Sequence, residues 1–171
     1  TLLQWDNIYY QPPTQSIVEK RPTVRIGMVQ WQMRPYNSID DLFEQVEFFV
    51  DSVSDYKSDF ILFPEYFNAP LMARFNDMGE AQSIRAMAQY TEKIRDRFVE
   101  LAISYNINII TGSMPFVKED GALYNVGFLC RRDGSYEMYE KIHVTPDEQK
   151  CWGLTGGSHV QTFDTDCGKI G

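Results

Sequence analysis

FILFPEYFN, at residues 60–68, predicts the central strand around which the rest of this chain is arranged. Its first four residues are all apolar, which predicts a short central strand buried on both faces. Pro64 ends this strand because proline cannot donate a hydrogen bond to a neighbouring strand. We therefore expect Glu65 at the carboxyl end of a strand, which is the edge where open α/β sheets collect ligands.

The segments around this strand alternate between strand and helix patterns. Residues 24–33 are rich in β-branched and apolar side chains and predict the first strand of the core. Ser38 and Asp41 resemble a capping box, and an apolar stripe at helical spacing follows them. This pattern predicts a helix that covers one face of the sheet. A second stripe over residues 84–105 predicts one long helix.

The second half of the chain contains a series of strand patterns. Residues 107–111 predict a strand, and Gly112 to Pro115 break it. Residues 123–130 and 136–141 predict two strands joined by a turn with an Asp-Gly pair, which is the strongest hairpin signal in the sequence. Lys141 is therefore expected at the end of the second strand of a hairpin.

The last residues continue the strand patterns, whereas the first residues show none. Residues 160–165 predict a strand that turns at residues 166–168 into residues 169–171. The order of elements predicts a layered α/β domain with a mixed sheet over residues 24–171. Residues 1–23 contain three prolines and no sustained periodicity. They predict an extended arm or linker, for which the tail of a preceding domain is one candidate.

The composition is that of an ordinary globular domain. The 171 residues suit a single domain and include 43% hydrophobic and 14% aromatic residues. A net charge of −8 argues against nucleic acid as a partner, because phosphate binding needs a basic face, and it disfavours an anionic membrane surface. No apolar run approaches the roughly 18 residues of a transmembrane helix, and no signal segment is recognisable. We expect a soluble cytoplasmic protein.

The cysteines and histidines favour neither a disulfide framework nor a metal site. Cys130, Cys151 and Cys167 are odd in number and lack the spacing of metal-binding pairs, and His143 and His159 are the only histidines. We expect reduced thiols with structural roles. Cys167 also has acidic neighbours, which raise the pKa of a thiol and make it a poorer nucleophile.

Three short motifs, taken in order, resemble one family. FPEYF surrounds Glu65, YEKIH surrounds Lys141, and DTDCGKIG occupies residues 164–171. They resemble the nitrilase, or carbon-nitrogen hydrolase, superfamily. The resemblance implies the N-terminal portion of a nitrilase-like α-β-β-α sandwich, incomplete at the C-terminus, over residues 24–171. It also implies that the catalytic cysteine follows shortly after Gly171, so the nucleophile is not in this chain and the domain needs its remaining C-terminal part.

The resemblance implies roles for three charged residues. Glu65 matches the general base that takes a proton from the cysteine thiol and later from water, and Lys141 matches the lysine that stabilises the oxyanion. On position alone, Glu65 is a solvated carboxylate at a strand end and Lys141 an edge-strand lysine that discourages aggregation. Glu148, in the segment TPDE, matches a second glutamate that positions substrate or the lysine in some members. An exposed loop acid is an equal alternative for Glu148.

A substrate pocket is expected beside these charged residues. Tyr66, Phe67, Asn68 and Trp152 flank the catalytic motifs and are candidates to line it, although aromatic residues near strand ends more often belong to a core or an interface. Asn125, in the segment LYNVGF, resembles a common family position and is a candidate to support the site. The candidate site includes no metal ligand.

The activity implied by the resemblance is hydrolysis of a non-peptide carbon-nitrogen bond. A cysteine thiolate attacks a small amide in the favoured interpretation and a nitrile or carbamoyl compound in the less favoured one, and no metal or organic cofactor is needed. The 171 residues alone are then expected to be inactive. One alternative is a non-catalytic fragment or pseudoenzyme that serves as a binding or assembly module, and another is an acyltransferase of the same fold. A homo-oligomer is expected in each case, since family members pair sandwich to sandwich.

Overall fold

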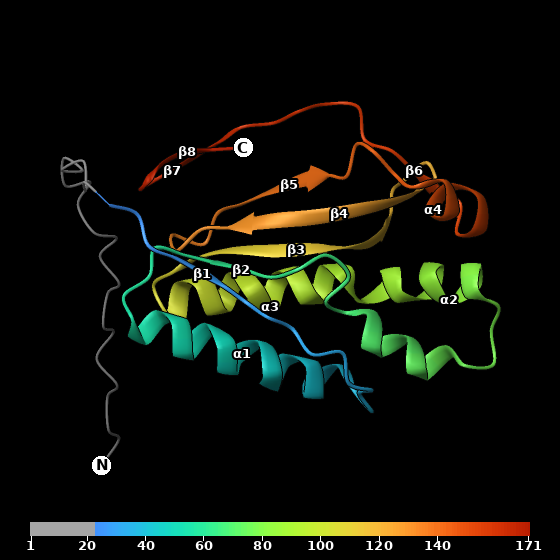
Figure 1. Ribbon diagram of the computed structural model, residues 1–171, viewed down its shortest axis with the longest axis horizontal. Helices are drawn as coiled ribbons and strands as arrows, with labels where there is room; N and C mark the ends of the chain where they lie inside the picture. The colour runs from blue at the N-terminus through green and yellow to red at the C-terminus, as the bar shows by residue number, and fades with distance from the viewer. Residues whose placement is uncertain (1–22) are drawn as a thin grey trace, which may run out of the picture.

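The computed structural model describes residues 23–171, and a six-stranded mixed sheet lies at its centre (Figure 1). The strands are β1 (Ile26–Met28), β2 (Phe60–Leu62), β3 (Asn108–Val117), β4 (Leu123–Cys130), β5 (Tyr136–Glu140) and β6 (Leu154–Thr155). β1, β2 and β3 are parallel, β3, β4 and β5 are antiparallel neighbours, and β6 pairs in parallel with β4. The arm predicted over residues 1–23 lies, except for its last residue, outside the described residues.

The helices α1 (Ile39–Asp55), α2 (Glu80–Met87) and α3 (Thr91–Ser104) cover one face of this sheet, whereas α4 (Pro146–Cys151) lies at its end beside β6 (Figure 1). Two 3-10 turns are η1 (Ala69–Phe75) and η2 (Ala88–Tyr90). α1 and α3 lie side by side below the sheet in Figure 1. The predicted capping box is confirmed, because Ser38 Oγ accepts from Asp41 N–H and the Asp41 carboxylate accepts from Ser38 N–H. No helix within residues 23–171 has the length and apolar character needed to cross a bilayer.

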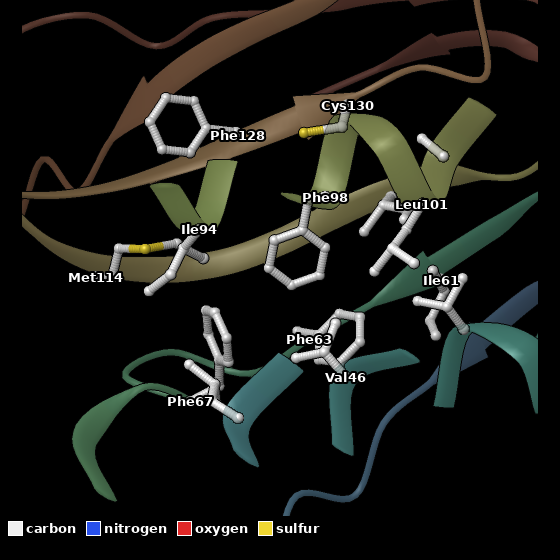
Figure 2. Packing of buried hydrophobic residues seen from close by; sticks show 14 of the residues in the cluster. Val46, Ile61, Phe63, Phe67, Ile94, Phe98, Leu101, Met114, Phe128 and Cys130 are labelled. Atoms are coloured by element: carbon white, nitrogen blue, oxygen red, sulfur yellow. The ribbon is translucent and has the colours of Figure 1, made fainter. Parts of the chain in front are cut away.

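The main core lies between the helices and the sheet (Figure 2). The rings of Phe63, Phe67 and Phe98 pack with their centroids 5.1 to 5.8 Å apart. α1 contributes apolar side chains at helical spacing, among them Leu42 and Val46, which are at most 1% exposed. Full burial of each such side chain stabilises the fold by about 1.5–3 kcal/mol. This packing anchors β2 and the segment that follows it.

A β-hairpin packs against the opposite face of the sheet. β7 (Phe163–Thr165) and β8 (Gly168–Ile170) form an antiparallel pair, so the predicted turn is confirmed although the first strand is shorter than residues 160–165. Phe163 packs against Phe60 and Leu129 of the main sheet. An apolar cavity of about 630 Å³ lies between the hairpin and the sheet. Both faces of the sheet are therefore apolar, and the predicted layered α/β architecture with a mixed sheet is confirmed.

The prediction of a single long helix over residues 84–105 is wrong, because η2 separates α2 from α3. Ile84 in α2 packs with Leu123 and Leu154, whereas Ile94 in α3 belongs to the main core. One straight helix presents a single apolar stripe to its surroundings. The break gives α2 and α3 separate apolar faces, each of which packs into a different hydrophobic cluster.

β3 continues through the residues at which we expected it to end. Its register against β4 shifts between Ile110 and Ser113, and pairing then continues to Val117. Gly112, within this bulge, has a φ of 71°, and a Cβ atom there would lie 2.1 Å from the carbonyl oxygen of Pro64. Glycine is required because the close approach leaves no room for a Cβ atom, and glycine also adopts the left-handed backbone without strain. The bulge brings β3 against the residue that precedes Glu65.

Candidate active site

The chain leaves β2 through a left-handed turn directly after Glu65. Tyr66 has a φ of 53°, and its N–H donates to the carbonyl oxygen of Ser113 at 2.7 Å. A non-glycine residue rarely adopts positive φ, so the surrounding contacts must hold this conformation. The turn interrupts the alternation of a strand, and Phe67 enters the main core one residue later.

Lys141 follows β5 and joins two carboxylates. Its Nζ lies 2.9 Å from Oε1 of Glu65 and 2.8 Å from Oε1 of Glu148. Its backbone N–H donates to the carbonyl oxygen of Asn125 at 2.9 Å, which extends the β4–β5 pairing to the site. The side chain of Lys141 is 22% exposed, against 47% for Glu65 and 5% for Glu148. The ammonium is therefore partly shielded between one accessible and one buried carboxylate.

Glu148 is a buried residue of α4 and not the exposed loop acid of the alternative interpretation. Thr145 N–H donates to Glu148 Oε2 at 2.6 Å, and Thr145 Oγ1 accepts from Glu148 N–H at 3.3 Å. Glu148 Oε1 accepts from Lys141 and, at 2.9 Å, from the hydroxyl of Tyr66. Sequence reasoning missed α4, although Thr145, Pro146 and Glu148 have the spacing of a capping box with proline at the first helical position.

These contacts fix the charges of Lys141 and Glu148. Burial disfavours the ammonium of Lys141, but hydrogen bonds to Glu148 and Glu65 outweigh burial and raise the pKa of Lys141. Burial also disfavours the carboxylate of Glu148, but hydrogen bonds from Lys141, Thr145 and Tyr66 outweigh it and lower the pKa of Glu148. Burial, and then the hydrogen bond to Glu148, raise the pKa of Tyr66. At neutral pH the ammonium and the Glu148 carboxylate are charged and the phenol is neutral.

Both hydrogen bonds to Glu65 fall on one of its two oxygens. Oε1 accepts from Lys141 Nζ and, at 2.7 Å, from Nδ2 of Asn125, which is fully buried in β4. Oε2 has no hydrogen-bond partner among residues 23–171. A held carboxylate with one open oxygen can accept a proton, and the adjacent ammonium can stabilise an anion. We refer to Glu65, Tyr66, Asn125, Lys141 and Glu148 as the Glu65 cluster.

Trp152 borders the Glu65 cluster through Tyr66. The two rings meet edge to face with their centroids 5.8 Å apart. Nε1 of Trp152 donates to Oε1 of Glu80 at 2.6 Å, which ties the end of α4 to the start of α2. Sequence reasoning did not find this contact, and no local pattern signals it because 72 residues separate the two partners.

Phe67 and Asn68, the other predicted pocket residues, are not brought to this cluster. Phe67 is fully buried among the aromatic rings of the main core (Figure 2). Asn68 is also fully buried, and neither side-chain amide atom has a hydrogen-bond partner among the described residues. For Phe67 the structure agrees with the alternative, in which an aromatic residue near a strand end belongs to the core.

The described cysteines form no hydrogen bond with the Glu65 cluster. Burial raises the pKa of Cys130 to about 12, and burial followed by the charge of Asp166 raises the pKa of Cys167 to about 12. Cys151 is exposed at the end of α4. Nor do residues 23–171 contain a cluster of three or more histidine, cysteine or acidic side chains that could hold a metal ion. The site chemistry of the described residues is therefore that of its carboxylates, ammonium and amide.

Solved structures of the nitrilase superfamily share this fold. Nit3 from Saccharomyces cerevisiae, a member of branch 10 of that superfamily, matches with a TM-score of 0.67 and 17% identity, over 85% of this chain and 53% of the yeast chain. An amidase from Nesterenkonia sp. also matches with a TM-score of 0.67 and 17% identity, over 85% of this chain and 53% of its own. The architecture is therefore that of the nitrilase-fold proteins.

The chain belongs to the carbon-nitrogen hydrolase family, whose match spans residues 25–171. A Bacillus subtilis protein named as a probable hydrolase is 42% identical over 171 residues, which are 99% of this chain and 33% of the relative. Nitrilase 3 of Arabidopsis thaliana is 27% identical over 172 residues, which cover 90% of this chain and 47% of the relative. The chain thus spans about a third to a half of these relatives, and the predicted family is confirmed.

Proposed function

We propose that the protein hydrolyses the carbon-nitrogen bond of a small amide, with Glu65 as general base and Lys141 as the cation that stabilises the oxyanion. The observation that carries this proposal is the position of Lys141 Nζ, 2.9 Å from Glu65 and 2.8 Å from Glu148. A cation held before the reaction stabilises charge that develops only in the transition state. The family match and the hydrolase relative support the same reaction class.

The nucleophile in this proposal is a cysteine outside residues 1–171. Glu65 takes the thiol proton on Oε2, and the thiolate sulfur forms a bond with the amide carbon. The carbonyl oxygen becomes an oxyanion beside the ammonium of Lys141. The carbon-nitrogen bond then breaks, and the nitrogen leaves as ammonia or an amine with the proton returned by Glu65. Water, deprotonated by Glu65, attacks the thioester and releases the carboxylic acid and the thiol.

Two further observations support details of this mechanism. In one mutant of the Nesterenkonia amidase, the acetamide moiety of fluoroacetamide adds covalently to the active-site cysteine, and structures of two other mutants of that enzyme hold butyramide or acrylamide. We therefore favour small aliphatic amides over nitriles. Glu148 has an auxiliary role in the proposal, since it is the buried anion that keeps Lys141 charged and in position.

The test is the release of ammonia from acetamide, butyramide and acrylamide by the full-length protein. Glu65→Gln and Lys141→Ala should each lower kcat/KM by at least ~10²-fold, which is the scale of removing a general base or an oxyanion stabiliser. Near-normal turnover in either folded variant contradicts the role assigned to that residue.

Matched controls come from ion pairs outside the Glu65 cluster. Glu47→Gln alters a carboxylate that accepts from Arg97 and Tyr105, and Lys118→Ala removes the partner of Glu140. Both control variants should retain turnover. If the folded wild-type protein releases no ammonia from any of these amides, the proposed function is wrong and a binding or assembly module is favoured.

A further inference from the structure

Asn125 contacts both charged residues of the proposed reaction from a single position in β4. Its side-chain Nδ2 donates to Oε1 of Glu65 at 2.7 Å, and its backbone carbonyl oxygen accepts from the N–H of Lys141 at 2.9 Å. The side chain is fully buried, and the residue is paired with Pro115 in the β3–β4 ladder. The positions of Glu65 and Lys141 are therefore both defined relative to one residue of the sheet.

The orientation of the Asn125 amide follows from its partner. A carboxylate only accepts hydrogen bonds when ionised, so the NH₂ group must face Glu65 and Oδ1 must point away from it. Oδ1 has no hydrogen-bond partner among the described residues. Among the described residues, the side-chain amide of Asn125 therefore makes one hydrogen bond, and that bond goes to Glu65.

Two donors on one oxygen make the two oxygens of Glu65 inequivalent. Lys141 Nζ and Asn125 Nδ2 both occupy Oε1, whereas Oε2 has no hydrogen-bond partner among residues 23–171. The terminal torsion of a free glutamate is broad and roughly two-fold, so an untethered carboxylate presents either oxygen in many orientations. The pair of donors removes this freedom while the side chain remains 47% exposed.

We propose that Asn125 is a positioning residue that, together with Lys141, holds Oε1 of Glu65 and leaves Oε2 as the oxygen that exchanges the proton. The inference rests on the proposed function, because it specifies which oxygen of the general base reacts. Holding a catalytic group in its productive orientation is worth a large factor in rate, and a misplacement of about 1 Å can cost 10²-fold.

The test is the pH dependence of kcat/KM in full-length Asn125→Asp. This change keeps the shape of the side chain but places a second carboxylate against Oε1 of Glu65, and two neighbouring carboxylates favour retention of a proton. The acidic limb of the profile should move to higher pH by about one pH unit or more, and kcat at pH 7 should fall by about 10- to 100-fold.

Asn108→Asp is the matched control. Asn108 is also fully buried in the sheet, and its Nδ2 donates to a carboxylate, Oδ1 of Asp166, at 2.8 Å, but it has no contact with the Glu65 cluster. This variant should leave the midpoints of the pH profile unchanged. If Asn125→Asp does not fold, Asn125→Ala replaces it, with an expected loss in kcat of about 10-fold or more and KM within about twofold of wild type.

The outcomes separate this inference from the proposed function. If Glu65→Gln is inactive but the profile of Asn125→Asp superimposes on that of wild type, the positioning role is overturned and the proposed function stands. An unchanged kcat in Asn125→Ala also overturns the positioning role and leaves the proposed function standing. If Glu65→Gln keeps wild-type turnover, the proposed function and the inference are both wrong.

Discussion

Replacement of Glu148 by glutamine tests whether the buried carboxylate holds the cluster together. In the native structure its two oxygens accept from Lys141 at 2.8 Å, from Tyr66 at 2.9 Å and from the N–H of Thr145 at 2.6 Å. Glutamine has nearly the same shape but offers one acceptor oxygen and one NH₂ group. If the oxygen faces Lys141 and Tyr66, the NH₂ group faces the N–H of Thr145 and that hydrogen bond is lost.

The expected loss of stability follows from these three hydrogen bonds. A hydrogen bond to a charged group contributes about 1.5–3 kcal/mol, against about 0.5–1.5 kcal/mol between neutral groups. The bond from Tyr66 then joins two neutral groups and is weakened by about 1 kcal/mol, the bond from Lys141 keeps its charged donor but is no longer an ion pair, and the bond from Thr145 is removed. The glutamine also avoids the cost of burying an anion, which offsets part of the loss. We expect Glu148→Gln to lower the free energy of unfolding by about 2–4 kcal/mol at pH 7.

The pH dependence gives an independent check on the same residue. Because the pKa of Glu148 is lowered in the folded protein, its contribution is fully present above the unfolded value of about 4.3 and is lost as the pH falls through the folded pKa. The stability difference between wild type and Glu148→Gln should therefore be full at pH 7 and shrink below about pH 4. The alkaline limb of the activity profile should move to lower pH, since Lys141 loses one anionic partner.

The assay is urea denaturation followed by tryptophan fluorescence from pH 7 to pH 3.5, with Glu47→Gln as the control. Glu47 accepts from Arg97 at 2.6 Å and from the hydroxyl of Tyr105 at 2.9 Å, so it has similar partners, but its side chain is 38% exposed. An exposed ion pair contributes about 0.2–1 kcal/mol, and the control should lose no more than this. A loss in Glu148→Gln as small as that of the control, or a difference that stays constant with pH, would show that the Glu148 carboxylate does not stabilise the folded protein through these hydrogen bonds.

The bulge in β3 and the cysteines give two further predictions. Gly112→Ala should lose at least ~2 kcal/mol of stability and most of its turnover, because a Cβ atom would lie 2.1 Å from the Pro64 carbonyl oxygen. Gly121 is the control, since it has a similar φ of 78° but no atom within 4 Å of the added Cβ. Gly121→Ala should lose only ~1–2 kcal/mol, as measured by urea denaturation. Equal losses in the two variants would contradict a positioning role for the bulge. Iodoacetamide at pH 8 should label exposed Cys151 first and Cys167 at least ~10²-fold more slowly, since the pKa of Cys167 is raised to about 12. Peptide mapping by mass spectrometry gives the two rates, and equal labelling would contradict the structural role of Cys167.

The elements that carry Glu65 and Lys141 were predictable because their signals are local. The apolar run before Pro64 confines β2 to a buried position, and the Asp-Gly turn between β4 and β5 sets the hairpin register. The capping box at Ser38 likewise needs only four neighbouring residues. In each case the pattern and the contacts that satisfy it lie within one short segment.

The contacts of the cluster were not predictable in the same way. The hydrogen bonds from Asn125 to Glu65 and from Tyr66 to Glu148 join residues 60 and 82 positions apart, and no periodicity records such pairs. Phe67 could belong to the pocket or to the core from its sequence position, and the turn at Tyr66 that precedes its burial has positive φ, which has no sequence signature at a tyrosine. The break between α2 and α3 depends on two separate clusters that form only in the folded protein.

The backbone hydrogen bond from Lys141 to Asn125 has a consequence for folding. Successive side chains of a strand point to opposite faces, so a slip of β5 by one residue against β4 would turn the ammonium away from Glu65. The contacts of the cluster also span long stretches of chain, and such contacts form late because their loop-closure entropy must first be offset. Chains that are partly folded or have a shifted strand register therefore lack the ion pairs of Lys141 with Glu65 and Glu148. These ion pairs form only when β4 and β5 pair in the native register.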